Sequence, residues 1–202
     1  MPGAMLRPED DRDILAASFE TEYEEVHNLK NFYKRVYEML EDEGWKSADS
    51  NGKDANFETL YFDKTTQDGA QFHHIWWRAI KIPEKNSYYR YFMKVDFQTL
   101  YMKKHELVIK GQKISSFKGS TIMRVSSYLQ LDYDDKFKNS SFINKLERKF
   151  RKRIYFAEVE KAKRDLYLGT YRFHTLVKQF MGMKPIIADW GRPFHPERGG
   201  VQ

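Results

Sequence analysis

Two long segments of this chain alternate polar and apolar side chains, and only a short connection joins them. Residues 70–82 and 88–101 each place aromatic or aliphatic side chains at every second position, and Pro83-Glu84-Lys85-Asn86 falls between them. A period of two is typical of β-strands. Neighbouring strands with a short connection must run antiparallel, because a parallel pair needs a long crossover. The sequence therefore predicts an antiparallel sheet.

Shorter strand patterns lie on both sides of this pair, bounded by turn-forming residues. The stretch 47–56 consists of turn-forming residues throughout, and Lys110-Gly111 predicts the turn of a hairpin. The further predicted strands are an edge strand over 18–26 and strands over 57–63, 105–109, 113–118 and 120–133.

Helical periodicity is clearest directly after Asn28, which is a competent N-cap. Apolar residues recur at a spacing of three and four from Leu29 to Leu40, and Gly44 is the residue expected just past the helix end. A second helical pattern begins at Ser140 or Ser141 and continues to about residue 181, with Gly169 as a point of bending or breakage.

The predicted layout is strand, helix, about six strands and then long helices. It defines a single α+β domain with a curved antiparallel sheet of about six or seven strands. In element order, residues 18–181 resemble the helix-grip fold of the START and pollen-allergen type proteins. That resemblance implies a C-terminal helix packed across a bent sheet around an apolar cavity. The single helix after the first strand departs from it, since that fold usually has two.

We expect three parts along the chain. Residues 1–17 form a flexible acidic arm, 18–181 the domain, and 182–202 an extended tail that contains proline and glycine. The sequence has no cysteine and no apolar run of transmembrane length, which excludes a disulfide scaffold and a helical membrane span. A cytoplasmic location is expected from this composition.

Charge is unevenly distributed along the chain. Residues 1–25 carry a net charge of −6, whereas residues 103–182 hold nineteen basic and eight acidic residues, a net charge of +11. A basic half favours an anionic partner such as nucleic acid, acidic lipid or acidic protein, although a well-solvated surface has the same composition.

One face of the predicted sheet combines aromatic rings with cations. Stacking on rings and contacts from cations to phosphates are what single-stranded nucleic acid requires. The same residue types also pair with each other simply to cover an open sheet face. The candidate residues on this face are Trp76, Arg78, Arg90, Phe92, Lys94, Arg124 and Tyr128.

A basic run in the predicted C-terminal helical region is the second candidate. Six of the nine residues from 145 to 153 are basic, and Leu146 and Phe150 keep to the apolar row, so the cations point outward. Such a helix can bind phosphates or an acidic membrane surface, or be an ordinary solvated face. Its basic residues are Lys145, Arg148, Lys149, Arg151, Lys152 and Arg153.

We therefore expect a non-enzymatic module that binds an anionic polymer, most plausibly RNA or single-stranded DNA. The alternatives are a helix-grip-like carrier of a small apolar ligand, and a structural or assembly protein that pairs through its sheet face as a homo-oligomer. The chain contains no catalytic motif of the phosphate-loop, serine-nucleophile or zinc-protease type. No cofactor or metal is expected.

Overall fold

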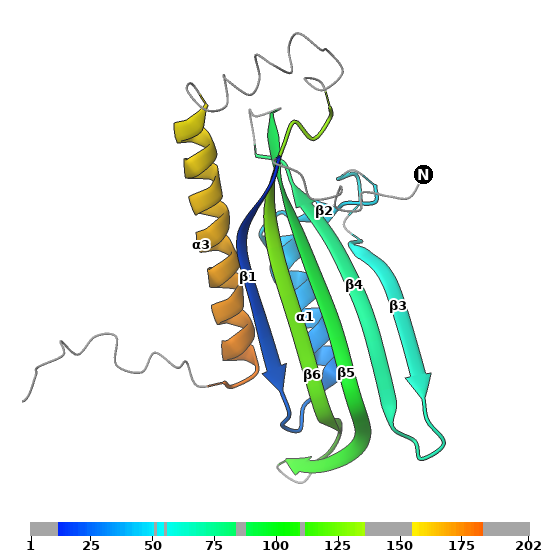
Figure 1. Ribbon diagram of the computed structural model, residues 1–202. Helices are drawn as coiled ribbons and strands as arrows, with labels where there is room; N and C mark the ends of the chain where they lie inside the picture. Colours follow the sequence, from blue (N-terminus) through cyan, green and yellow to red (C-terminus); the bar gives the residue numbers. More distant parts are fainter. Residues whose placement is uncertain are drawn as a thin grey trace, which may run out of the picture.

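The protein is an α+β domain built on one open, six-stranded antiparallel sheet (Figure 1). The computed structural model describes residues 12–50, 52–54, 56–83, 88–109, 112–135 and 155–183, with the side chains of 107–109 and 112–115 not included. The strand order is β1-β6-β5-β4-β2, and β3 also pairs with β4. The strands are β1 (Asp13–Tyr23), β2 (Lys46–Ser47), β3 (Glu58–Thr65), β4 (Gln71–Lys81), β5 (Tyr89–Ile109) and β6 (Gln112–Leu131).

The first strand begins earlier than the sequence pattern predicts. β1 starts at Asp13, so residues 13–17, assigned above to the flexible arm, belong to the sheet. Arg12 contributes to this start, because its guanidinium lies 2.7 Å from the carboxylate of Asp135 and 3.5 Å from that of Asp132. These two ion pairs tie the beginning of β1 to the end of β6.

β5 and β6 form one long hairpin, where the sequence indicated separate strands with breaks near residues 102–104 and at Gly119. The pairing shifts by one residue between Leu100 and Lys103, and Tyr101 takes a φ of 53°. This bulge bends both strands without ending them. The predicted turn at residues 110–111 falls between β5 and β6, outside the described part of the chain.

The first helix confirms the prediction from its apolar stripe. α1 (Leu29–Asp42) begins after Asn28, whose side chain accepts a hydrogen bond from the backbone N–H of Asn31. Gly44 follows the helix with a φ of 81°, and Trp45 folds back into the core.

The second described helix is α3 (Phe156–Phe180), which passes through Gly169 without a break. The predicted start of a helix at Ser140 or Ser141 lies outside the described residues.

The hydrophobic core lies between the two helices and one face of the sheet. α1 packs its aromatic side chains against β4 and β5, and α3 packs mainly against β1 and β6. Trp77 is fully buried at the centre, and its ring stands edge-on to Tyr33, Tyr37 and Phe97. Figure 1 looks onto the other face of the sheet, with α1 behind the strands. We call this other face the open face.

Candidate nucleic-acid interface

The strand register brings all seven candidate residues of the sheet onto the open face. Arg78 lies opposite Lys94 across β4 and β5, and Phe92 lies opposite Tyr128 across β5 and β6. Trp77, Val95, Val125 and Leu129 occupy the alternate positions and are buried in the core. The alternation read from the sequence thus places each of these side chains on the correct side.

Three of the seven are nevertheless buried and cannot present a surface to a ligand. Phe92 is 0% exposed, and Arg90 and Tyr128 are each 8% exposed. Ala48, which follows β2, packs with Ile80, Phe92 and Tyr128 into a second, smaller core on this face. The predicted stacking roles of Phe92 and Tyr128 therefore do not fit the structure.

Arg90 is held inside the sheet by polar contacts. Its Nε donates to the side-chain oxygen of Gln130 at 2.8 Å, and its guanidinium lies 5.2 Å from the ring centre of Tyr133. The amide of Gln130 donates in turn to Asp13 at 3.1 Å. This chain of contacts satisfies a buried charge, as a stable fold requires, so Arg90 has a structural role.

The part of the open face nearer the β3–β4 turn carries exposed aromatic rings. Trp76 is 40% exposed, Phe62 on β3 is 51% exposed, and Tyr101 at the bulge of β5 is 67% exposed. Phe72 and His74 lie between them on β4. The centre of the Phe72 ring is 4.9 Å from that of Tyr101, and the centre of the His74 ring is 6.5 Å from that of Phe62. We call these five side chains the aromatic row.

The sequence contained part of the signal for the aromatic row. Phe72, His74 and Trp76 share one face of β4 by simple alternation. Phe62 joins them only because β3 pairs with β4 in the observed register, and Tyr101 only because the bulge reorients it. Pairing register and bulges are tertiary features, so neither residue could be assigned to the row from periodicity.

Both arginines of the exposed region are already paired with carboxylates. Nη1 of Arg78 lies 2.6 Å from Asp96, and its guanidinium is 5.6 Å from the centre of the Trp76 ring. Nε of Arg124 lies 2.6 Å from Glu20. These contacts cover the sheet and neutralise much of its positive charge.

Two lysines of the open face have no such partner. Lys64 lies opposite Phe72, and Lys94 lies opposite Arg78. Neither forms an ion pair with any residue that the structure describes. Lys103, by contrast, lies 3.1 Å from Asp68 at the β3–β4 turn. Hydrogen bonds from Thr66 and Lys103 hold the pKa of the Asp68 carboxyl down at about 2.

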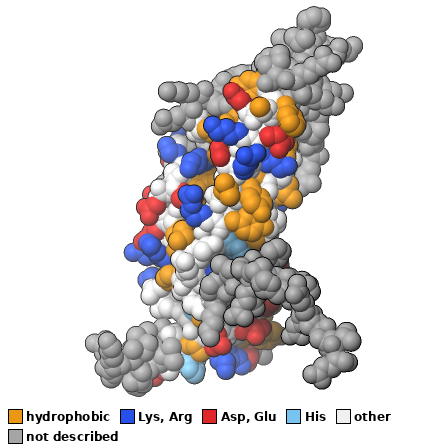
Figure 2. Space-filling model, turned by 90° about the vertical axis from the view of Figure 1, so that its left-hand side faces the viewer, with side chains coloured by type: hydrophobic (Ala, Val, Ile, Leu, Met, Phe, Trp, Pro, Cys, Tyr) orange, Lys and Arg blue, Asp and Glu red, His pale blue; other side chains and the backbone are white. Residues whose placement is uncertain are grey.

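The basic run at residues 145–153 lies outside the described residues, so its six cations are not placed. The α3 side of the molecule, seen in Figure 2, mixes basic, acidic and hydrophobic side chains. α3 belongs to the basic segment 103–182, yet it carries the acidic residues Glu158, Glu160 and Asp165 as well as basic ones.

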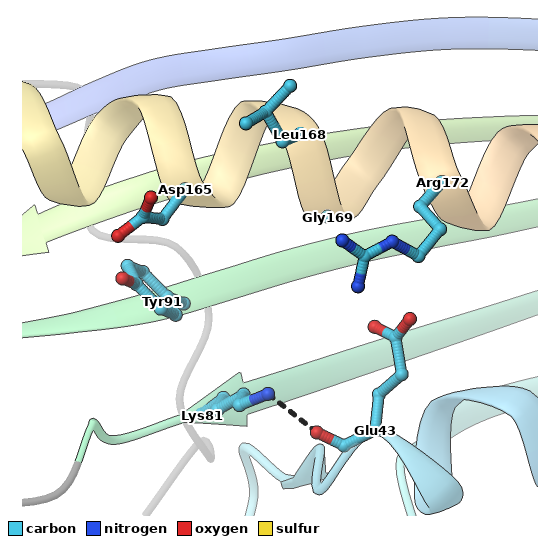
Figure 3. A pocket seen from close by; sticks show the side chains of 7 residues that line it. All are labelled: Glu43, Lys81, Tyr91, Asp165, Leu168, Gly169 and Arg172. Carbon is cyan, nitrogen blue, oxygen red and sulfur yellow. Dashed lines mark hydrogen bonds between the residues drawn. The ribbon is translucent and has the colours of Figure 1, made fainter.

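The helix side of the sheet holds a hollow of about 520 Å³ between α3, β4, β5 and the end of α1 (Figure 3). Four of its seven lining residues carry charged side chains, namely Glu43, Lys81, Asp165 and Arg172. Such a lining suits a polar ligand better than the apolar ligand of the carrier hypothesis.

No protein-family model and no curated protein sequence matches the chain. Among the described residues, no group of three or more His, Cys, Asp or Glu side chains could hold a metal ion. In the same part of the chain, neither helix has the length and apolar character needed to cross a membrane.

Proposed function

We propose that the protein is a binding module for single-stranded nucleic acid, RNA or DNA, which lies across the aromatic row. The observation that carries this proposal is the exposure of Trp76, Phe62 and Tyr101 on one face of the sheet, beside the unpaired lysines Lys64 and Lys94. The rings would stack on bases and the lysines would contact phosphates. The proposal is narrower than the sequence-based one, because it leaves out Arg90, Phe92 and Tyr128.

Stacking would supply most of the affinity. Each base stacked on an aromatic side chain contributes about 1–3 kcal/mol, and the contribution depends little on which base it is. Arg78 and Arg124 keep their carboxylate partners, so they would add less than free cations do. We therefore expect weak sequence preference and a salt dependence that corresponds to only a few phosphates.

The arrangement of the layers supports this choice of face. Both described helices pack on one side of the sheet, and they leave the other side accessible near the β3–β4 turn. The basic run at residues 145–153 would add phosphate contacts if it reaches the nucleic-acid strand bound on the aromatic row. Its loss would reduce the salt dependence of binding.

A fluorescence-anisotropy titration tests the proposal. A labelled oligonucleotide of mixed sequence, single-stranded in one arm and duplex in the other, is titrated with the full chain at about 50 and 200 mM salt. We expect binding of the single strand, weaker at the higher salt, and weaker binding of the duplex, whose bases are not free to stack. Absence of binding at low salt, or an affinity that salt does not change, would refute the proposal.

Assembly through the sheet is the competing use of the same surface. Leu60, Tyr61 and Phe62 are exposed on β3, which is an edge strand, and a bare edge strand can pair with another chain. Light scattering at the concentrations of the titration separates the two uses. A stable dimer whose formation protects Trp76 from a fluorescence quencher would assign the face to self-association instead.

A further inference from the structure

The hollow on the helix side of the sheet is built by four separate elements. Glu43 directly follows α1, Lys81 ends β4, Tyr91 lies on β5, and α3 supplies the rest of the lining, Asp165, Leu168, Gly169 and Arg172. Its volume of about 520 Å³ lies in the range of small-molecule sites. Asp165, Leu168 and Arg172 are exposed, so the hollow is accessible from the α3 side.

Charges of both signs line this hollow without pairing across it. Lys81 donates a 2.6 Å hydrogen bond to the backbone oxygen of Glu43, at the C-terminal end of α1. Within the described chain, no ion pair joins Glu43, Lys81, Asp165 and Arg172 to one another or to any other residue. Charged groups that neither pair with each other nor collapse together leave their interactions open to a ligand.

The charges are also separated along the hollow. In Figure 3, Asp165 lies above Tyr91 at one end, whereas the Arg172 guanidinium lies above the Glu43 side chain toward the other end, and Lys81 lies below them. Burial raises the pKa of Tyr91 to about 12, and the neighbouring Tyr89 and then the Asp165 carboxylate add to the shift. The Tyr91 hydroxyl therefore stays protonated at neutral pH and can serve as a neutral hydrogen-bonding group next to Asp165.

Gly169 contributes to the open space of the hollow. It occupies the interior of a 25-residue helix, where glycine is less favourable than alanine by about 1 kcal/mol. A Cβ built at this position meets no atom within 4 Å, so no close packing explains the missing side chain. Since Gly169 lines the hollow, its absent side chain keeps open space beside the helix backbone.

We propose that this hollow is a second binding site, which takes a small zwitterion of the amino-acid type: a free amino acid or a short peptide. The carboxylate would contact Arg172 and Lys81, the ammonium would contact Asp165, and the ligand backbone would pass beside Gly169. A ligand with its two charges separated along its length can contact Asp165 toward one end of the hollow and Arg172 toward the other, whereas a single ion can contact only one of them.

Calorimetric titration of the full chain with triglycine at neutral pH tests this site, because the free peptide is then a zwitterion. Two matched probes remove one charge each: the N-acetylated peptide lacks the ammonium, and the C-terminal amide lacks the carboxylate. We expect triglycine to bind at least about tenfold more tightly than either probe, as is typical for losing a hydrogen-bonded charge. Equal binding of all three, or no binding by any, would overturn the proposal.

Variants then locate the binding. Arg172→Gln and Asp165→Asn should each weaken triglycine binding by about tenfold or more. Arg164→Gln and Glu160→Gln remove the same types of charge from exposed positions on the same helix outside the hollow, and they should leave binding unchanged. Equal effects in both pairs would mean that the peptide responds to the overall charge of α3 rather than to the hollow, which would also overturn the proposal.

Gly169→Leu tests the space itself. The new side chain should fill part of the hollow and abolish triglycine binding, while the melting temperature stays equal or rises because leucine favours the helix. Unchanged triglycine binding in this folded variant would place the ligand elsewhere. Because the site lies on the opposite face from the aromatic row, oligonucleotide binding should be the same in all these variants.

Discussion

The guanidinium of Arg78 is fixed diagonally across two strands, with its Nη1 2.6 Å from the carboxylate of Asp96 on β5. The same nitrogen donates to the backbone oxygen of Trp77 at 2.7 Å. Only 13% of the Arg78 side chain is exposed. The cation that lies over the exposed ring of Trp76 is therefore part of the sheet and is only partly available to a phosphate.

Removal of the Asp96 charge should make Arg78 available to nucleic acid. In Asp96→Asn, we expect tighter binding of a single-stranded oligonucleotide and a salt slope that steepens by about 0.7, which corresponds to one more phosphate contact. Anisotropy titrations over a series of salt concentrations measure both. A slope equal to that of the wild type would mean that Arg78 stays committed to the sheet and does not contact the strand.

Glu38→Gln is the matched control for this charge change. Glu38 pairs with Lys34 and Arg35 on the surface of α1, on the other side of the sheet. The Glu38→Gln substitution alters the net charge by the same amount as Asp96→Asn does, but far from the aromatic row. If Glu38→Gln steepens the salt slope as much as Asp96→Asn does, the effect comes from net charge alone.

Two adjacent tryptophans should respond to substitution in opposite ways. Trp76 is 40% exposed and Trp77 is 0% exposed. Trp76→Ala should weaken oligonucleotide binding by about 1–3 kcal/mol and lower the free energy of unfolding much less than Trp77→Ala does, because part of its ring is already exposed. Trp77→Ala should lower the free energy of unfolding by about 3–5 kcal/mol, because a large buried side chain leaves a cavity.

Urea denaturation and anisotropy titration measure the two effects of the tryptophan pair separately. Trp77 also donates to the hydroxyl of Tyr33 at 3.3 Å, so its loss removes a hydrogen bond as well as packing. A Trp76→Ala protein that binds the oligonucleotide like the wild type would contradict the stacking role assigned to this ring.

The fold was predictable from the sequence wherever a single periodic pattern covers one element. The stripe after Asn28 gives α1 with its cap, and alternation separates Trp76 from Trp77 on β4. Alternation could not show that β5 continues past Tyr101. A bulge shifts the phase of the pattern by one residue, so one bent strand has the same sequence signature as two strands with a break between them.

The sequence predicts which face of the sheet the candidate residues occupy, but it does not predict which of them are exposed. Period two assigns Phe92 and Tyr128 to the open face, where they do lie. They are buried there in a small core with Ile80 and Ala48, and Ala48 belongs to a segment that the sequence marks only as a turn. Coverage of a strand by a distant loop is a tertiary contact, and no local pattern in either segment encodes it.

Gly119 and Gly169 should respond to alanine in opposite directions. A Cβ on Gly119 would lie 2.8 Å from the backbone oxygens of Leu100 and Tyr101, so the bulge of β5 must move to accept it. Gly119→Ala should lower the free energy of unfolding by about 1–3 kcal/mol, as overpacking does. Gly169→Ala, in open space, should raise it by up to about 1 kcal/mol.

Urea denaturation of both glycine variants checks the prediction. The two substitutions are chemically identical and differ only in the space beside the new methyl group. A stable Gly119→Ala protein would show that the long hairpin tolerates a shift at its bulge, and that the close approach does not fix its bend.

Acid should destabilise the protein through His73. Its side chain is buried on β4, and Nδ1 lies 2.7 Å from the hydroxyl of Thr99 on β5. Burial lowers the pKa of His73 below its ordinary value of about 6.5, and the charge of Asp63 opposes this shift without cancelling it. The unfolded chain therefore takes up a proton at a higher pH than the folded chain, so stability falls as the pH drops through about 6.5.

Urea denaturation at about pH 7.5 and 5.5 measures this loss, which should be smaller in His73→Gln than in the wild type. Burial also lowers the pKa of His174, which is stacked on Phe19, so the double variant His73→Gln/His174→Gln should depend on pH still less. His105→Gln, at an exposed position of β5, controls for the loss of a histidine and should follow the wild type. If His73→Gln instead loses as much stability as the wild type over this interval, the acid sensitivity belongs to other groups and His73 is protonated equally in both states.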